Sequence, residues 1–150
     1  MVELIRTDSS NADFQALVVL LDQDLRERDG EDHAFYAQFN KIDHLQHVIV
    51  AYVNDEAVGC GAFKPYADST VEIKRMFVLP AFRGQRIAQQ VLAKLEGWAS
   101  EINASVCVLE TGQKQPKAIQ LYQRTGYVVI PNYGQYVGVT NSVCMKKTIA

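Results

Sequence analysis

The chain of 150 residues is long enough to bury the core of one domain, and we expect a single domain over residues 1–150. Hydrophobic residues make up 48% and charged residues 21%, which is typical of globular proteins, and no apolar run approaches the ~20 residues of a membrane span. The net charge of -2 argues against broad binding to nucleic acid. Residues 1–10 lack a basic-then-apolar signal pattern, so we expect a cytoplasmic protein with no membrane partner.

The cysteines and histidines do not form the pattern of a metal or disulfide site. Cys60, Cys107 and Cys144 are widely spaced and lie in apolar runs, which predicts reduced, buried thiols. The histidines at 33, 44 and 47 are close in sequence but lack the helical spacing or the carboxylate partners of a metal centre. We therefore expect no metal.

The first third of the chain reads as a strand followed by a helix. Residues 2–7 are predicted to form a short strand, and Ser10 with Asp13 resembles a capping box at the start of a helix that ends near Gly30. That helix is predicted from apolar residues at helical spacing, namely Phe14, Leu17, Val18, Leu21 and Leu25. The polar, aromatic stretch 31–46 is expected to form a second, short helix.

The rest of the chain alternates between strand and helix signals. Strands are predicted at 47–53, 57–63 and 70–79, the first two joined by a turn at Asn54 and Asp55. An amphipathic helix over 87–102, a strand at 105–112, a helix at 115–126 and two final strands at 127–130 and 142–149 follow. This order predicts an α/β fold with a mixed sheet, antiparallel at first and joined by helical crossovers later.

Residues 83–88, with the sequence RGQRIA, lie where a strand gives way to a helix. The unpaired amides of a helix entrance, with Arg83 and Arg86 beside them, are suited to a pyrophosphate. A solvated basic turn has the same local sequence, so both interpretations stay open on these residues alone.

At this point the chain resembles the GNAT family of N-acetyltransferases. Its signature of Arg or Gln, two residues, Gly, one residue, then Gly or Ala is matched at Arg83 and Ala88, but Arg86 stands at the glycine position. The segments VEIKRMFVLPAFRG, LETG and AIQLYQRTGY extend the resemblance over essentially the whole chain. The resemblance implies a mostly antiparallel central sheet flanked by helices, with two splayed strands forming an acetyl-CoA cleft.

The resemblance also implies which residues bind the cosubstrate, acetyl-CoA. Backbone groups of Phe77 and Val78 would bind the pantetheine arm, and Tyr122 would face the thioester sulfur. The pyrophosphate would lie on Arg83, Gly84, Gln85, Arg86, Ile87 and Ala88.

Transfer of an acetyl group from a thioester to an amine needs a base, a donor for the oxyanion and an acid for the thiolate. Tyr122 is the candidate acid, with simple packing in its helix as the alternative. Glu72 is the candidate base, with a surface glutamate paired to a lysine or arginine as the alternative. The amide of Val78 is the candidate oxyanion donor.

The acceptor site is expected in the loops around residues 28–40 and 132–141, with Asp32, Tyr36 and Tyr136 binding the amine; a lid or a dimer surface is the alternative.

The function predicted is acetyl-CoA-dependent N-acetylation of a small-molecule primary amine. A CoA-binding protein without turnover, which the arginine at 86 favours, is the alternative. A homodimer through the last strand is a further expectation.

Overall fold

A seven-stranded sheet forms the centre of the computed structural model, which describes residues 1–29 and 44–149. Its strand order is β1-β2-β3-β4-β5-β7-β6. The strands are β1 (Val2–Thr7), β2 (His47–Val53), β3 (Glu56–Ala67), β4 (Thr70–Val78), β5 (Val106–Gly112), β6 (Val128–Ile130) and β7 (Ser142–Thr148). The helices are α1 (Ala12–Asp29), α3 (Ile87–Glu101) and α4 (Pro116–Arg124), with 3-10 turns η2 (Pro80–Phe82) and η3 (Gly134–Tyr136).

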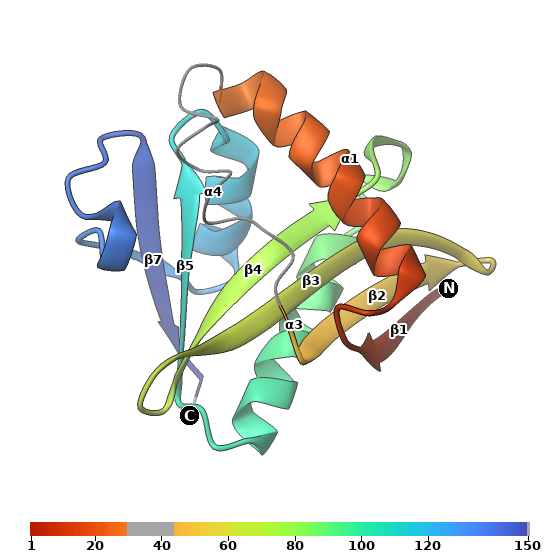
Figure 1. Ribbon diagram of the computed structural model, residues 1–150, viewed down its shortest axis with the longest axis horizontal. Coiled ribbons are helices and arrows are strands. Elements are labelled where there is room, and N and C mark those ends of the chain that lie inside the picture. Colours follow the sequence, from red (N-terminus) through yellow and green to blue (C-terminus); the bar gives the residue numbers. More distant parts are fainter. Residues whose placement is uncertain (30–43, 150) are drawn as a thin grey trace.

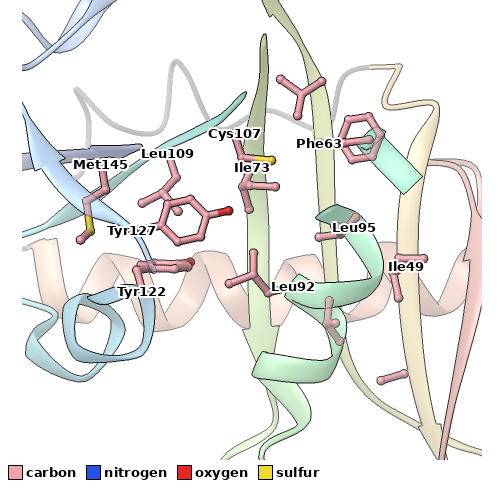
Figure 2. Packing of buried hydrophobic residues seen from close by; sticks show 14 of the residues in the cluster. Ile49, Phe63, Ile73, Leu92, Leu95, Cys107, Leu109, Tyr122, Tyr127 and Met145 are labelled. Carbon is pink, nitrogen blue, oxygen red and sulfur yellow. The ribbon is translucent and has the colours of Figure 1, made fainter. Parts of the chain in front are cut away.

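Helices cover both faces of the sheet. Figure 1 shows α1 crossing in front of it, whereas α3 and α4 lie behind. The α1 side is packed by Phe14, Leu17 and Val18 against strand residues that include Cys60 and Phe77. The opposite side is the larger cluster, and Figure 2 shows Leu92 and Leu95 of α3 packed there with residues of β2 to β5 and β7. The predicted α/β fold with a mixed, mostly antiparallel sheet is confirmed.

Helix α1 begins one residue later than the sequence pattern predicted. The side-chain oxygen of Asn11 accepts a hydrogen bond from the amide of Phe14 at 2.9 Å, which makes Asn11 the N-cap. Ser10 instead donates its hydroxyl to Asp8, so the predicted capping box of Ser10 and Asp13 is wrong. Ser10 is not the N-cap, because both its amide and its hydroxyl donate to Asp8. The side-chain oxygen of Asn11 then accepts from the third helical amide.

Several local expectations are confirmed. The three cysteines are free and buried, and the turn between β2 and β3 consists of Asn54 and Asp55, both with positive φ as a two-residue hairpin needs. Most of the segment 31–46, expected to be helical, lies outside the described residues, and the described part, 44–46, is not helical. Within the described residues, no helix is both long and apolar enough to cross a membrane.

Strand β4 carries a bulge at Arg75. Cys60 of β3 pairs with Phe77, but Ala62 pairs with Lys74, so two residues of β4 face one residue of β3. Arg75 has a φ of 60°, in the left-handed region. The bulge turns Arg75 to the α1 side of the sheet, where it pairs with Asp22. Lys74 lies on the same side, because it is opposite Ala62 in β3. Two consecutive cationic side chains therefore point to the same face of the sheet.

Strands β4 and β5 separate after three paired residues. Their parallel pairing runs from Thr70 opposite Val106 to Glu72 opposite Val108, although β4 continues to Val78 and β5 to Gly112. On its far side β5 remains paired with β7 along its whole length. The divergence leaves the ends of β4 and β5 with unpaired edges that face each other, as the resemblance implied.

Gly61, opposite the bulge, is predicted to be essential to the packing of α3. A Cβ there would lie 2.5 Å from Sδ of Met76 and 2.9 Å from methyl groups of both Leu95 and Val91. Gly61→Ala should therefore lower the free energy of unfolding by about 1–3 kcal/mol in urea denaturation. The control is Gly97→Ala in α3, where a Cβ has open space and should raise it by about 0.5–1 kcal/mol. Equal effects of the two substitutions would contradict this packing.

Candidate active site

A cavity of about 120 Å³ lies where β4 and β5 diverge. Its walls come from both sides of the sheet, because Leu21 and Leu25 belong to α1 whereas Ala118 and Tyr122 belong to α4. The remaining lining residues are Glu72, Ile73, Lys74, Arg75, Met76, Glu110, Thr111, Gly112, Gln115 and Tyr136. The cavity thus brings residues from opposite faces of the sheet together through the gap.

Tyr122 lines this cavity from α4. Its side chain is buried, and its ring meets that of Tyr127 edge to face at 5.7 Å between centroids. Figure 2 shows the two rings beside Leu109 and Met145, with their hydroxyl ends directed to the side of Ile73. Burial, and then the negative charge of Glu110, raises the pKa of Tyr122. The phenol is therefore protonated at neutral pH and is able to donate a proton.

Glu72 lies at the point of divergence and is held by a tyrosine. It is only 3% exposed, so it is not a surface residue, although it does pair with a lysine as that alternative expected. The hydroxyl of Tyr133 donates a hydrogen bond to Oε2 at 2.6 Å, and Nζ of Lys74 lies 3.9 Å from Oε1. Burial, and then the charge of Glu72, raises the pKa of Tyr133. The carboxylate is thereby fixed in the cavity wall by one strong, charge-assisted bond.

The acceptor residues predicted from the sequence are only partly described. Tyr136 of η3 is 2% exposed and lines the cavity, and burial, followed by the charges of Glu110 and Glu72, raises its pKa. Its ring meets that of Tyr133 edge to face at 5.8 Å. Asp32 and Tyr36 lie outside the described residues. The structure thus brings Tyr136 to the same cavity as Tyr122 and Glu72.

The end of β4 presents one free backbone edge to the gap. The amide of Leu79 donates to the carbonyl of Val58 in β3 at 2.8 Å, and backbone groups alternate in direction along a strand. The amide of Val78 therefore points away from β3, into the gap. The backbone of Phe77 points to β3, where it pairs with Cys60, and its side chain packs in the cluster on the α1 side. Met76, rather than Phe77, shares the orientation of Val78.

The loop before α3 is exposed and is anchored by Arg83. Nε of Arg83 donates to the carbonyl of Val78 at 2.9 Å, and its guanidinium lies 5.6 Å from the ring centroid of Phe77. A further nitrogen lies 4.0 Å from Asp24 of α1. Gly84 and Gln85 are exposed, the side chain of Ile87 is buried in the core, and Ala88 is half-buried. The amide of Arg83 donates to the carbonyl of Pro80 at 3.3 Å, and the side chain of Arg86 is exposed.

Arg86 adopts a left-handed backbone conformation at the start of α3. Its φ is 65° and its ψ 20°. It is the N-cap residue, and the helix itself begins at Ile87. Glycine adopts this conformation without strain, so the backbone at Arg86 is one that a glycine at this position would favour.

The sequence predicted no individual role for two residues of this site. Tyr133 bonds to Glu72 in the cavity wall, and Arg75 lines the cavity itself. For Arg75 a signal exists: the apolar residues Val71, Ile73, Met76 and Val78 pack on the α3 side at spacings of two, three and two. A strand keeps a spacing of two, so the step of three marks a bulge at the intervening pair.

Within the described part of the chain, no group of three His, Cys, Asp or Glu residues could hold a metal ion. His44 is exposed, and His47 is half-buried and stacked on Phe63 at 4.5 Å between centroids. His33 lies outside the described residues.

Comparisons with known proteins point to one family. The model of the acetyltransferase (GNAT) family matches residues 14–127. The IAA acetyltransferase of Azospirillum brasilense is 34% identical over 102 residues, which is 67% of this chain and 67% of that protein. The aminoalkylphosphonate N-acetyltransferase of Salmonella typhimurium is 34% identical over 93 residues, or 59% of this chain and 60% of that protein.

A solved structure extends the similarity to nearly the whole fold. A candidate acyl-CoA N-acyltransferase from Klebsiella pneumoniae superposes with a TM-score of 0.84 at 28% sequence identity. The match covers 100% of this chain and 99% of that one.

The left-handed backbone of Arg86 predicts that glycine is the better residue there for stability. Arg86→Gly should raise the free energy of unfolding by up to about 1 kcal/mol, because glycine has no Cβ to strain this conformation. Arg86→Ala is the control, since it removes the same guanidinium but keeps the Cβ, and it should give no such gain. Chemical denaturation of both variants distinguishes them; an equal change in both would argue against the left-handed conformation.

Proposed function

Because the chain belongs to the GNAT family of acetyltransferases, whose members transfer acyl groups from acetyl-CoA, we propose that it acetylates the primary amine of a small molecule. We take residues 1–150 as one acetyltransferase domain in the cytoplasm. The names of the two curated relatives, an IAA acetyltransferase and an aminoalkylphosphonate N-acetyltransferase, support a small-molecule acceptor.

The observation that carries this proposal is the cavity at the divergence of β4 and β5. A candidate acid, Tyr122, reaches it from α4, and a candidate base, Glu72, reaches it from β4. Direct transfer needs both groups around one reacting carbon. Their presence in one cavity is the arrangement that such a reaction requires.

The free edge of β4 and the loop before α3 fit acetyl-CoA. The Val78 amide, which points into the gap, would donate a hydrogen bond to the thioester oxygen as negative charge develops on it. The amides of residues 84–88 at the entrance of α3 would hold the pyrophosphate, helped by the positive end of the helix. Arg83 would act on this site mainly by fixing the loop, because its guanidinium bonds to the Val78 carbonyl.

In the proposed reaction, Glu72 takes a proton from the acceptor ammonium, directly or through a water, while Tyr133 keeps its carboxylate in place. The amine attacks the thioester carbon, a C–N bond forms, and the Val78 amide stabilises the oxyanion. As the C–S bond breaks, Tyr122 donates its proton to the departing thiolate. The second amine proton is lost to solvent, and solvent returns a proton to the phenolate.

The alternative of a CoA-binding protein without turnover rested on the arginine at position 86. Since its backbone keeps a glycine-like conformation and its side chain is exposed, the substitution does not by itself require loss of the phosphate site. We therefore favour an active transferase.

The test is release of thiol from acetyl-CoA in the presence of a panel of primary amines. The wild-type protein should release CoA faster with an acceptor amine than without one. Tyr122→Phe should lower kcat by ~10²–10⁴ with little change in the affinity for acetyl-CoA, because it removes the proton donor but keeps the ring.

Tyr127→Phe is the matched control for that prediction. Tyr127 is a buried neighbour whose hydroxyl donates to Glu96 of α3 at 2.8 Å and does not line the cavity. Its substitution should cost about 1 kcal/mol of stability and leave kcat within a few-fold of wild type. Unchanged turnover in Tyr122→Phe would assign Tyr122 to packing, and tight acetyl-CoA binding with no amine-stimulated release would support the alternative.

Glu72 is predicted to act as the base. Glu72→Gln is nearly isosteric and should lower kcat by ~10²–10⁴ at pH 7, since the amide cannot accept the amine proton. The control is Glu96→Gln, a partly buried carboxylate on α3 that bonds to Tyr127 and Lys147, and it should lower stability without changing kcat. A Glu72→Gln variant with wild-type kcat at all pH values would leave deprotonation of the amine to water.

A further inference from the structure

Arg75 presents a buried positive charge to the cavity. Its side chain is 2% exposed, and its Nη1 donates to Oδ1 of Asp22 in α1 at 2.8 Å. Its Nη2 is buried and has no hydrogen-bond partner within residues 1–29 and 44–149. The reaction proposed above uses neither nitrogen, although Arg75 lines the cavity in which that reaction would occur.

A buried guanidinium nitrogen without a partner is costly. Each such donor loses its water on folding and recovers the cost only through a hydrogen bond. Asp22 compensates only in part, because its side chain is 45% exposed and its charge is screened by solvent. The left-handed backbone at Arg75 adds strain, and strained residues of this kind are common at functional sites.

The chemistry that satisfies Nη2 is an oxyanion. Arginine has a planar fork of donors and binds carboxylate and phosphonate groups with two parallel bonds. Lys74, on the face to which the bulge turns Arg75, adds a second basic side chain to the cavity wall. Two carboxylates, Glu72 and Glu110, line the same cavity and favour a cationic group there.

We propose that the acceptor is a zwitterion, a small primary amine that also carries a carboxylate or phosphonate, and that Arg75 binds this anionic group. The proposal rests on the proposed function and specifies its substrate class. The carboxylates of Glu72 and Glu110 would bind the ammonium group of the acceptor, and the guanidinium of Arg75 would bind its carboxylate or phosphonate. Both charged groups of one molecule would then be paired in the cavity.

The first experiment needs only the wild-type enzyme and matched acceptors. Glycine, β-alanine and 4-aminobutanoate are each compared with the corresponding carboxamide, which has the same shape without the negative charge, and 2-aminoethylphosphonate is added as a dianion. We expect kcat/KM to be at least ~10-fold higher for the best anionic acceptor than for its neutral partner. Carboxamides that are used as well as the acids would overturn the proposal.

The second experiment identifies the residue. Arg75→Gln should raise the KM for the anionic acceptor by ~10-fold or more beyond any change in the KM for the carboxamide, without raising the KM for acetyl-CoA. Arg75→Lys, which keeps the charge but not the fork, should be intermediate. The matched control is Arg6→Gln, an exposed arginine paired with Glu101 far from the cavity, which should change none of these values. Weaker acetyl-CoA binding without loss of anion preference would assign Arg75 to the cosubstrate and overturn the proposal.

A binding measurement separates failure of this proposal from failure of the proposed function. Propylphosphonate has no amine and cannot react, so its titration into the CoA-saturated protein reports the anion site alone. Binding to wild type that is weakened ~10-fold or more in Arg75→Gln supports the anion site even if no amine is acetylated. Acetylation of neutral amines without propylphosphonate binding would retain the transferase and reject the anion site. Because the acceptor comparison uses wild type, it decides the question even if Arg75→Gln fails to fold.

Discussion

The separation of β4 from β5 after Glu72 and Val108 is the constraint on which the site depends. A sheet normally satisfies the backbone groups of every interior strand, so a gap between two interior strands leaves donors and acceptors that must find other partners. In this fold the gap is bordered by the Val78 amide and by a cavity reached from both faces. Pairing of β5 with β7 along its whole length keeps β5 rigid while its other edge is free.

The bulge at Arg75 works together with this separation. It inserts one residue into β4, so the apolar side chains before and after it still face α3 while two cations face α1. Gly61 on β3 makes room for Met76 directly opposite. Packing on one side of the sheet and charge on the other are thus set by a single extra residue, which is a typical use of bulges near functional sites.

Charge in the cavity is arranged in buried pairs rather than spread over a surface. Glu72 bonds to Tyr133, Arg75 bonds to Asp22, and the phenol of Tyr122 is kept protonated by its burial and by Glu110. In a site with little water, such interactions are stronger than they would be at the surface. Glu72 and Arg75 are therefore each held in one orientation by a neighbour from a different element.

The order of elements, the sheet type and the strand-to-helix entrance at 83–88 were determined by the sequence, because periodicities of two and 3.6 and turn residues are local properties. Resemblance to a family predicted Tyr122 and Glu72 as site residues, and the aromatic loop predicted Tyr136; all three line one cavity. Tertiary structure alone decided that Tyr133 holds Glu72, which lies 61 positions earlier in the chain, and that Arg83 bonds back to β4. It also decided the N-cap at Asn11 and the left-handed backbone at Arg75 and Arg86. These features depend on which groups come close together in the folded chain. Residue spacing along the sequence does not give that information.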